Sequence, residues 1–230
     1  MKLSVIIPTL NEELTIEKTL EAISRLINVE EIIIVDGGSS DKTIEKIENF
    51  EKIKETKLIN FGEANRGKQM HEGTKFAEGD IFWFVHADTR PTQGSGEQIK
   101  RHMRYSEVIG GNFEIIFSGE SRWAKFLTWL YPQLLSLELV YGDSAFFVRR
   151  EIYEKMGGFK SFPLFEDLDF YKRLKKHGRF VHVNLPVVTS SRRFENKSFL
   201  WTFIKWSIRQ GLYWIGVSPK LLGKTYKQIR

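Results

Sequence analysis

The stretch IIIVDGGSSD at residues 32–41 joins a continuous apolar run to a polar turn that contains two glycines. Four consecutive branched apolar residues are typical of a parallel strand that is buried on both faces. Similar runs occur at 3–7 and 81–85, and 56–60 predicts a shorter strand. Apolar residues recur at helical spacing between these strands, in three segments: 13–26, 41–50 and 67–77. This alternation predicts an α/β fold with a mostly parallel central sheet flanked by helices.

The second half of the chain does not continue the regular alternation of strands and helices. Its predicted elements are strands at 108–117 and 144–148, one or two strands around Pro186 within 180–188, and helices at 123–139, 165–176 and 199–215. No repeat, linker or low-complexity segment interrupts the chain. We therefore predict a single domain over residues 1–230.

The bulk composition excludes several classes of site. The chain has no cysteine, which excludes thiolate metal sites, thiol catalysis and a disulfide scaffold. Its net charge of +6 indicates either attraction to anions or an ordinary lysine-rich surface. It opens on a strand-like run without signal-peptide features, and no apolar stretch reaches about 18 residues. We expect a cytoplasmic protein, with a peripheral position at the inner face of the membrane as an alternative.

Ligands of open α/β sheets bind beyond the carboxyl ends of the strands, so the residues that directly follow strands are informative. They lie at 8–12, 36–41 and 86–88. The Asp36 carboxylate can accept hydrogen bonds from a nucleobase or a ribose hydroxyl, and the glycines after it allow close approach of the backbone. The alternative is a helix N-cap turn formed by Ser40 or Asp41.

His86 and Asp88 follow another buried strand. Residues two apart on an extended chain point the same way, so both side chains can face one ligand. One carboxylate together with diphosphate oxygens suits Mg²⁺, and a nearby imidazole favours Mn²⁺. The alternative is that Asp88 caps a turn before Pro91 while His86 only packs.

An acidic cluster, with Glu166 and Asp167 at its start, precedes a basic helix end. It indicates either a general base or acids that complement the helix dipole. Arg192 and Arg193 follow a strand pattern and can clamp diphosphate oxygens, or they are surface arginines. The same two interpretations apply to cations at the start of the third helix: Arg66 and Lys68.

The order of these motifs resembles that of the family 2 glycosyltransferases, which have the GT-A (Rossmann-like) fold. The segments that carry the resemblance are 5–12, 35–41, 65–73, 86–88, 166–167 and 190–194. The resemblance implies an inverting, metal-dependent enzyme that moves a sugar from a UDP- or GDP-type donor to a hydroxyl acceptor. It divides the chain into a nucleotide-binding half at 1–90, an acceptor half at 91–195 and a C-terminal helical appendage at 196–230.

The resemblance also implies residue roles. Asp167 would be the base with Glu166 in support, Asp88 and His86 would bind Mn²⁺ or Mg²⁺, and the acceptor would meet Asp143 and Asn112. The residues expected to bind the nucleotide sugar are Pro8, Thr9, Asn11, Glu12, Asp36, Gly38, Ser39, Arg66, Lys68, Arg192 and Arg193.

Within the family, the chain resembles a short subgroup described as radical-SAM- or selenium-associated, or as acting in arsenosugar biosynthesis. The shared segments are 111–113, 141–143 and 191–194. Gly37 replaces the second Asp of the usual Asp-Asp-Gly-Ser run, and His86 replaces the first Asp of Asp-X-Asp. Ser190 and Phe194 stand where a Gln and a Trp are common in processive synthases, so processive synthesis is not expected.

Other function classes fit less well. A nucleotidyltransferase would have a glycine-rich phosphate loop after the first strand, whereas residues 8–12 contain no glycine. A dinucleotide dehydrogenase would need the motif Gly-X-Gly-X-X-Gly after a strand, and the sequence contains no such motif. A non-enzymatic basic module that binds nucleotides or membranes is a further alternative, and we expect no nucleic-acid partner.

The predicted helix at 199–215 is amphipathic. Its polar arc is narrow, it carries several large aromatic rings, and a basic tail follows it. The basic residues of that tail are Lys220, Lys224, Lys227 and Arg230. Such a helix can lie in an anionic membrane interface, which would make a lipid-linked acceptor plausible. The alternative is packing on the chain's own core or on a second copy.

Overall fold

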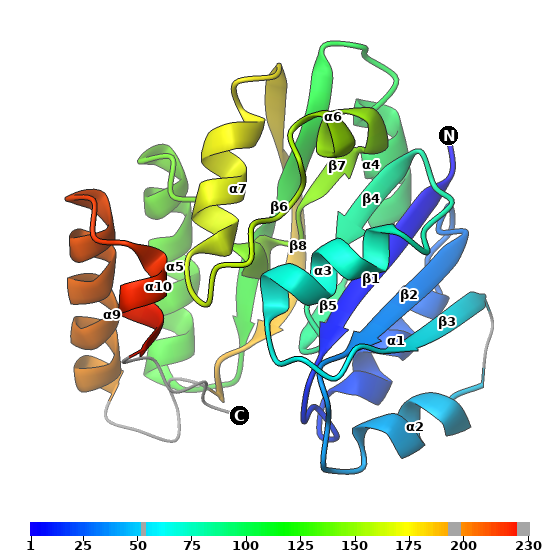
Figure 1. The fold of residues 1–230 in the computed structure, drawn as a ribbon, viewed down its shortest axis with the longest axis horizontal. Coiled ribbons are helices and arrows are strands. Elements are labelled where there is room, and N and C mark those ends of the chain that lie inside the picture. The colour runs from blue at the N-terminus through cyan, green and yellow to red at the C-terminus, as the bar shows by residue number, and fades with distance from the viewer. Residues whose placement is uncertain (52–53, 193–198, 225–230) are drawn as a thin grey trace.

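The computed structural model describes residues 1–51, 54–192 and 199–224. Helices cover a twisted central sheet (Figure 1). The N-terminal elements are β1 (Leu3–Thr9), α1 (Ile16–Ser24), β2 (Glu31–Asp36), α2 (Thr43–Asn49), β3 (Glu55–Asn60), α3 (Arg66–Thr74), β4 (Ile81–Phe84), β5 (Thr89–Pro91) and α4 (Ser95–His102). The later elements are β6 (Val108–Ser118), α5 (Arg122–Ser136), the 3₁₀ turn η1 (Gly142–Ser144), β7 (Phe147–Arg149), α6 (Arg150–Lys155), α7 (Glu166–Leu174), β8 (Arg179–Ser190), α9 (Phe199–Trp214) and α10 (Pro219–Lys224).

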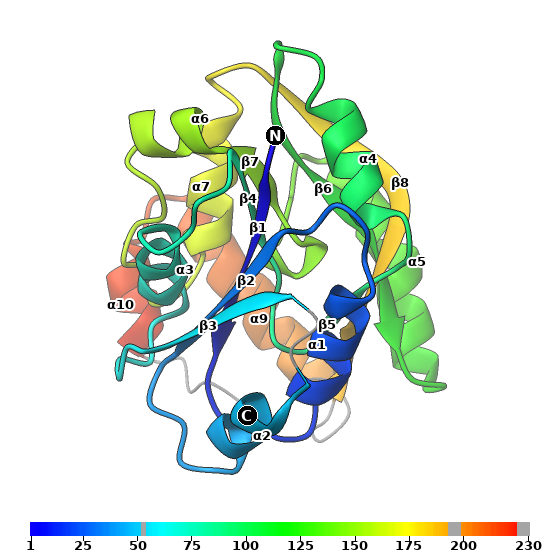
Figure 2. The same ribbon diagram turned by 90° about the vertical axis from the view of Figure 1, so that its right-hand side faces the viewer.

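The described residues form one eight-stranded sheet in the order β3-β2-β1-β4-β7-β6-β8-β5. Strands β1 to β4 pair in parallel, β7 runs antiparallel to β4 and β6, and β6 pairs in parallel with β8. Helices lie on both faces of the sheet (Figure 2). The predicted α/β fold with a mostly parallel sheet is therefore confirmed.

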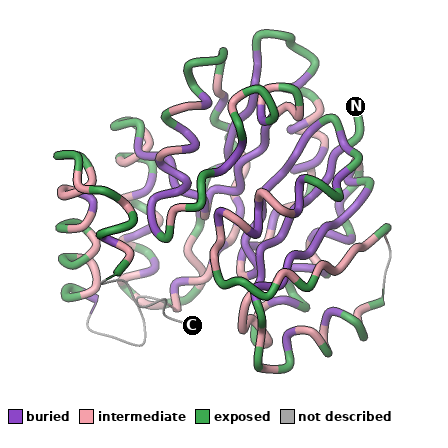
Figure 3. The backbone as a smooth tube through the Cα atoms, in the orientation of Figure 1, coloured by how far each residue is buried: buried purple, intermediate pink, exposed green. Residues whose placement is uncertain are grey.

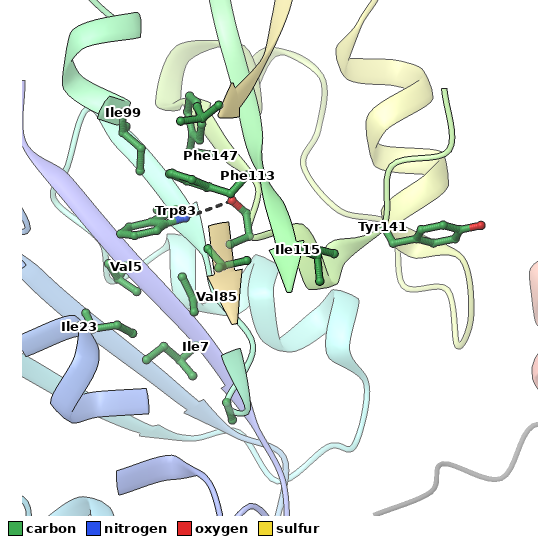
Figure 4. Close-up of a cluster of buried hydrophobic side chains, with 14 of the residues drawn as sticks. Val5, Ile7, Ile23, Trp83, Val85, Ile99, Phe113, Ile115, Tyr141 and Phe147 are labelled. Atoms are coloured by element: carbon green, nitrogen blue, oxygen red, sulfur yellow. Dashed lines mark hydrogen bonds between the residues drawn. The ribbon is translucent and has the colours of Figure 1, made fainter. Parts of the chain in front are cut away.

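The alternation of strand side chains creates a core on each face of the sheet. On one face Val5 and Ile7 of β1 pack in a cluster with Ile23 of α1, while Ile6 belongs to the cluster on the other face. Trp83 is fully buried in the first cluster, and its indole N–H donates to the carbonyl of Ala145 over 3.1 Å (Figure 4). The two clusters hold the carboxyl ends of β1, β2 and β4 at one edge.

Several short helices and strands were not predicted from the sequence. The strand expected at 144–148 is the turn η1 followed by β7, and β5, α4, α6 and α10 were not predicted. α4 carries a single buried apolar side chain, Ile99, so its sequence lacks the repeated apolar positions that predict a helix. The segment around Pro186 is one strand, β8, because a register shift between Phe113 and Glu114 accommodates the proline opposite.

Helix α9 lies beside α5 at one side of the molecule (Figures 1 and 3). Trp123 of α5 stacks on Phe199 of α9 with ring centres 4.0 Å apart, and Trp206 of α9 meets Tyr141 at 5.1 Å. Packing on the chain's own core is thus one role of this helix. Among the described residues, no helix has the length and apolar character needed to cross a bilayer.

Candidate active site

A cavity of about 180 Å³ lies at the carboxyl ends of β1 and β4, between α3, α7 and the end of β8. The ten predicted site residues that line it are Pro8, Thr9, Glu12, Arg66, His86, Asp88, Asp143, Glu166, Asp167 and Arg192. They come from segments far apart in the sequence. The parallel strands and the returning strand β8 bring them to one edge of the sheet.

The loop after β1 supplies one polar group without a partner. Thr9 is buried, it lines the cavity, and its hydroxyl has no hydrogen-bond partner among the described residues. An unpaired buried hydroxyl costs free energy, so it indicates a position that a ligand completes. Asn11 lies outside the cavity and ties this loop to the next one: its backbone N–H donates to Ser39 Oγ over 2.9 Å.

The Asp36 carboxylate organises the loop after β2. It accepts hydrogen bonds from the backbone N–H groups of Gly38 and Ser39 at 2.7 and 2.8 Å, and from Ser39 Oγ at 2.5 Å. None of these three residues lines the cavity. The N-cap of α2 is Lys42, and Asp41, one residue before it, accepts a hydrogen bond from the backbone N–H of Thr43, the first residue of α2, at 3.0 Å. Asp36 thus shapes the loop beside the cavity.

Gln69 was missed by sequence reasoning, although it lies one turn after Arg66 on α3 and lines the cavity. Its side-chain amide donates to the backbone carbonyls of Thr9 and Val35, each over 2.8 Å. It therefore ties α3 to the ends of β1 and β2. A Cβ at Gly37 would lie 3.0 Å from Gln69 Nε2, so the residue that departs from the usual Asp makes room for this amide.

Asp88 stands in a cluster of charges. Arg192 pairs with Glu12 and also lies 3.6 Å from Asp88, and His86 Nδ1 is 2.9 Å from a carboxylate oxygen of Asp143. Burial, followed by repulsion from Glu12 and Asp143, raises the pKa of Asp88 above its ordinary value. The four acids and bases around Asp88 therefore share one electrostatic environment.

Glu166 and Asp167 begin α7 and are both buried. Arg66 pairs with Glu166 and lies 3.9 Å from Asp167. Asp167 accepts from the backbone N–H groups of Gly142 and Leu168, each over 2.8 Å. Burial, and then repulsion from Glu166, nevertheless raises the pKa of Asp167 to about 6, against the opposing charge of Arg66. This carboxylate is fixed in place, and its pKa is raised toward neutral pH.

The residue before this acid pair adopts a left-handed backbone conformation. Phe165 has φ 62° and is buried. Such a conformation is strained for a non-glycine residue and persists only where the surroundings hold it. The rings of Trp206 and Tyr213 from α9 hold Phe165, with centres 5.6 and 5.0 Å away. Helix α9 thus supports the turn that presents Glu166 and Asp167 to the cavity.

Residues 4–162 match the family model described as glycosyl transferase family 2. The chain belongs to this family. The match covers strands β1 to β7 apart from Leu3, the loops after β1, β2 and β4, and the whole of η1, and it ends before α7 and β8.

Curated relatives of this family-2 chain are distant in sequence. It is 26% identical to the Probable glycosyltransferase YdaM of Bacillus subtilis over 222 residues, which cover 87% of this chain and 53% of that protein. It is 28% identical to the dolichyl N-acetyl-alpha-D-glucosaminyl phosphate 3-beta-D-2,3-diacetamido-2,3-dideoxy-beta-D-glucuronosyltransferase of Methanococcus voltae, over 91% of this chain and 71% of that protein. The chain thus spans about half the length of the first of these relatives.

Solved structures support the fold. The mannosyltransferase PcManGT of Pyrobaculum calidifontis, in complex with GDP-Man and Mn²⁺, superposes with a TM-score of 0.69 at 17% identity. The superposition covers 98% of this chain and 69% of that one. At this identity the similarity shows a shared GT-A fold.

Some predicted residues of the family-2 site are not brought into the cavity. Lys68 is partly exposed and pairs with Glu63 over 2.5 Å. Asn112 was expected on the acceptor side, but it is fully buried between Tyr131 and His182, with 2.5 Å to His182 Nδ1. Asn112 does not line the active-site cavity, so its role on the acceptor side stays a prediction. The predicted residue Arg193 lies outside the described residues.

Proposed function

We propose that the chain transfers a sugar, with inversion, from a nucleotide-diphosphate donor to a hydroxyl acceptor, and that Asp167 is the general base. One observation carries the proposal. Asp167 is a buried carboxylate that lines the cavity, is held by two backbone N–H groups and has its pKa raised to about 6. A base whose pKa lies close to the working pH transfers protons efficiently.

The proposed step is a single displacement. The acceptor hydroxyl gives its proton to Asp167 as its oxygen bonds to the anomeric carbon, and the bond from that carbon to the diphosphate oxygen breaks on the opposite face. Glu166 and Arg66 position the base, because their ion pair fixes the start of α7 beside α3. Arg192, which here pairs with Glu12 and Asp88, is the cation nearest to where a diphosphate would meet Asp88.

The charges of the cavity fit a divalent cation. Five carboxylates line it against two guanidinium groups, namely those of Arg66 and Arg192. Within the described ranges, no three acidic or histidine side chains form a complete metal site, so a cation there would also need oxygens from the ligand. Asp88 is the residue we propose to hold it, with His86 nearby. A bound Mn²⁺ or Mg²⁺ would neutralise charge on the leaving diphosphate.

Thr9, Glu12 and the loop shaped by Asp36 are our candidates for the nucleoside side. The unpaired Thr9 hydroxyl supports this assignment. The complex of PcManGT with GDP-Man and Mn²⁺ supports a nucleotide-diphosphate donor and a divalent ion. The narrower resemblance to the radical-SAM-, selenium- or arsenosugar-associated subgroup stays a prediction.

The donor proposal predicts a metal-dependent gain in thermal stability. UDP or GDP with Mn²⁺ should raise Tm by several degrees, because a ligand at about 100 times its Kd stabilises the native state by about 2.7 kcal/mol. The chelator EDTA should remove most of that gain. A response to nucleoside triphosphates but not to diphosphates would favour a nucleotidyltransferase instead. No nucleotide response with any metal would contradict the proposal.

We also propose that the protein binds membranes peripherally through an outer apolar face, formed by Trp129 of α5 and by Leu200, Trp201, Ile204 and Ile208 of α9. These five side chains are 43–62% exposed. Lys205 places its ammonium 5.1 Å from the Trp201 ring, so positive charge accompanies the apolar surface. Aromatic rings next to cations suit an anionic headgroup region.

This membrane proposal predicts co-sedimentation with liposomes that contain acidic lipid at low salt. The double variant Trp201→Glu/Ile208→Glu should lose most of the bound fraction, because it puts two carboxylates on the outer apolar face. The matched control is Phe76→Glu/Tyr105→Glu, which changes exposed apolar residues outside α5 and α9. Equal sedimentation of the two double variants would overturn the assignment of this face.

A further inference from the structure

A second cavity, of about 300 Å³, lies between β6, α5 and α9. It adjoins the candidate active site, because five residues line both cavities: Arg66, Phe117, Asp143, Asp167 and Trp206. The charged groups of the second cavity all lie at this shared end. Its other walls are mostly apolar and include five leucines of α5 and of the segment that follows it.

The arrangement of α5 and α9 explains why the space is open. The two helices meet near their N-terminal ends, where Phe126 and Trp123 of α5 contact Phe199 of α9. Further along, Leu130 and Leu134 face the cavity from α5, and Ser207, Gln210 and Trp214 face it from α9. Gln210 is anchored by its side-chain oxygen, which lies 2.9 Å from the Tyr141 hydroxyl. The helices are thus joined at one end and are separated by the cavity at the other.

The second cavity reaches the surface at its apolar end. Leu137 and Trp214 line it and are 68% and 60% exposed. It therefore runs from the carboxylate of Asp167 to solvent, past walls that offer few hydrogen-bond partners. A polar acceptor such as a free sugar would leave its hydroxyls unpaired against leucine side chains, which is unfavourable. A molecule with one polar end and an apolar chain would match both ends.

We propose that this cavity binds the aliphatic chain of a lipid-type acceptor and so places the acceptor hydroxyl at Asp167. This inference rests on the proposed function, since it names the substrate class of the same site. The volume is near the lower end of typical ligand cavities, roughly 300–1,000 Å³. A chain longer than the cavity would leave it at the exposed end lined by Leu137 and Trp214.

The test compares octyl β-D-glucoside, below its critical micelle concentration, with methyl β-D-glucoside in titration calorimetry. The octyl compound should bind at least about tenfold more tightly, because each buried methylene strengthens binding about fourfold. Ser207→Trp should lower the ratio of the two affinities by at least about tenfold. Ser207 is an exposed position that lines the cavity, and a tryptophan there would fill it. Ser136→Trp is the matched control, an exposed serine of α5 that does not line the cavity.

Two outcomes would overturn the inference: no preference for the octyl compound, or an equal preference in Ser207→Trp and Ser136→Trp. The second result would place the chain elsewhere on the apolar surface. Binding of UDP or GDP with Mn²⁺, measured on the same samples, should be unchanged in both variants and shows that they are folded. If the unmodified protein did not bind UDP or GDP with Mn²⁺, that result would contradict the proposed function. The comparison of the two glucosides would still decide the role of the cavity.

Discussion

Asp167→Asn should lower turnover by about 10²- to 10⁴-fold, the range expected when a general base is removed. The substitution keeps the size of the side chain and one acceptor oxygen, so α7 should still begin at the same place. Donor affinity should change by no more than about twofold, because the proposed contact of Asp167 is with the acceptor. Turnover and the nucleotide Kd, measured on the same preparation, separate these two effects.

The controls for this experiment lie on the same helix. Asp169→Asn removes a carboxylate that pairs with Arg173 at 2.7 Å and with Lys160 at 3.2 Å, and Asp169 does not line the active-site cavity. Its turnover should stay within about threefold of the parent value. If Glu166→Gln were inactive while Asp167→Asn stayed active, the roles within the acid pair would be reversed.

The pH dependence provides a second readout for the same residue. A base acts in its deprotonated form, and the pKa of Asp167 is raised to about 6. kcat/KM should therefore be high above pH 6 and fall about tenfold per pH unit below it. The residual activity of Asp167→Asn should lack this acidic limb.

The sequence was sufficient to predict two of the loops that line the cavity, those after β1 and β4, whereas the predicted loop after β2 lies beside it. The loops after β1 and β4 end buried parallel strands, and parallel strands place their carboxyl ends at one edge of the sheet. The position of Asp88 follows from this rule alone. Glu166 and Asp167 required the family resemblance, because acids in the first turn of a helix have a common structural explanation.

Other contacts could not be predicted, since they depend on packing between distant segments. His86 contacts Asp143, which is 57 residues away in the sequence. Asp143 lies in the short 3₁₀ turn η1, which has no periodic pattern in the sequence that would predict it. Gln69 resembles any polar helix residue until α3 is docked on β1 and β2. The space that it needs also explains Gly37, which the sequence presented only as a departure from the family pattern.

The partners of Arg66 and Arg192 also differ from those predicted. Arg66 and Arg192 were expected to meet diphosphate oxygens, yet in the structure both pair with carboxylates of the cavity. Both guanidinium groups are therefore already paired, and an anionic ligand has to compete with these carboxylates for them. The remaining excess of carboxylates is the feature that a divalent cation would complement.

Asp88→Asn should lower metal-dependent turnover by about 10²-fold or more, because polarisation of a phosphoryl oxygen by a metal is worth several kcal/mol in the transition state. It should also abolish the difference between UDP binding measured with Mn²⁺ and with EDTA. The carboxylate is the reason for both effects: asparagine keeps the shape of the side chain but loses the charge that attracts the cation.

The matched control for this prediction is Asp80→Asn. It removes a carboxylate of 63% side-chain exposure that accepts a hydrogen bond from the backbone of Lys2, at the amino ends of the strands and away from the cavity. Its nucleotide binding should keep the full response to Mn²⁺. Calorimetric titrations of UDP and GDP into both variants, with and without the metal, decide the question. If Asp88→Asn kept the same dependence on Mn²⁺ as Asp80→Asn, the cation would have to be held by Glu12 or Asp143, which share the electrostatic environment of Asp88.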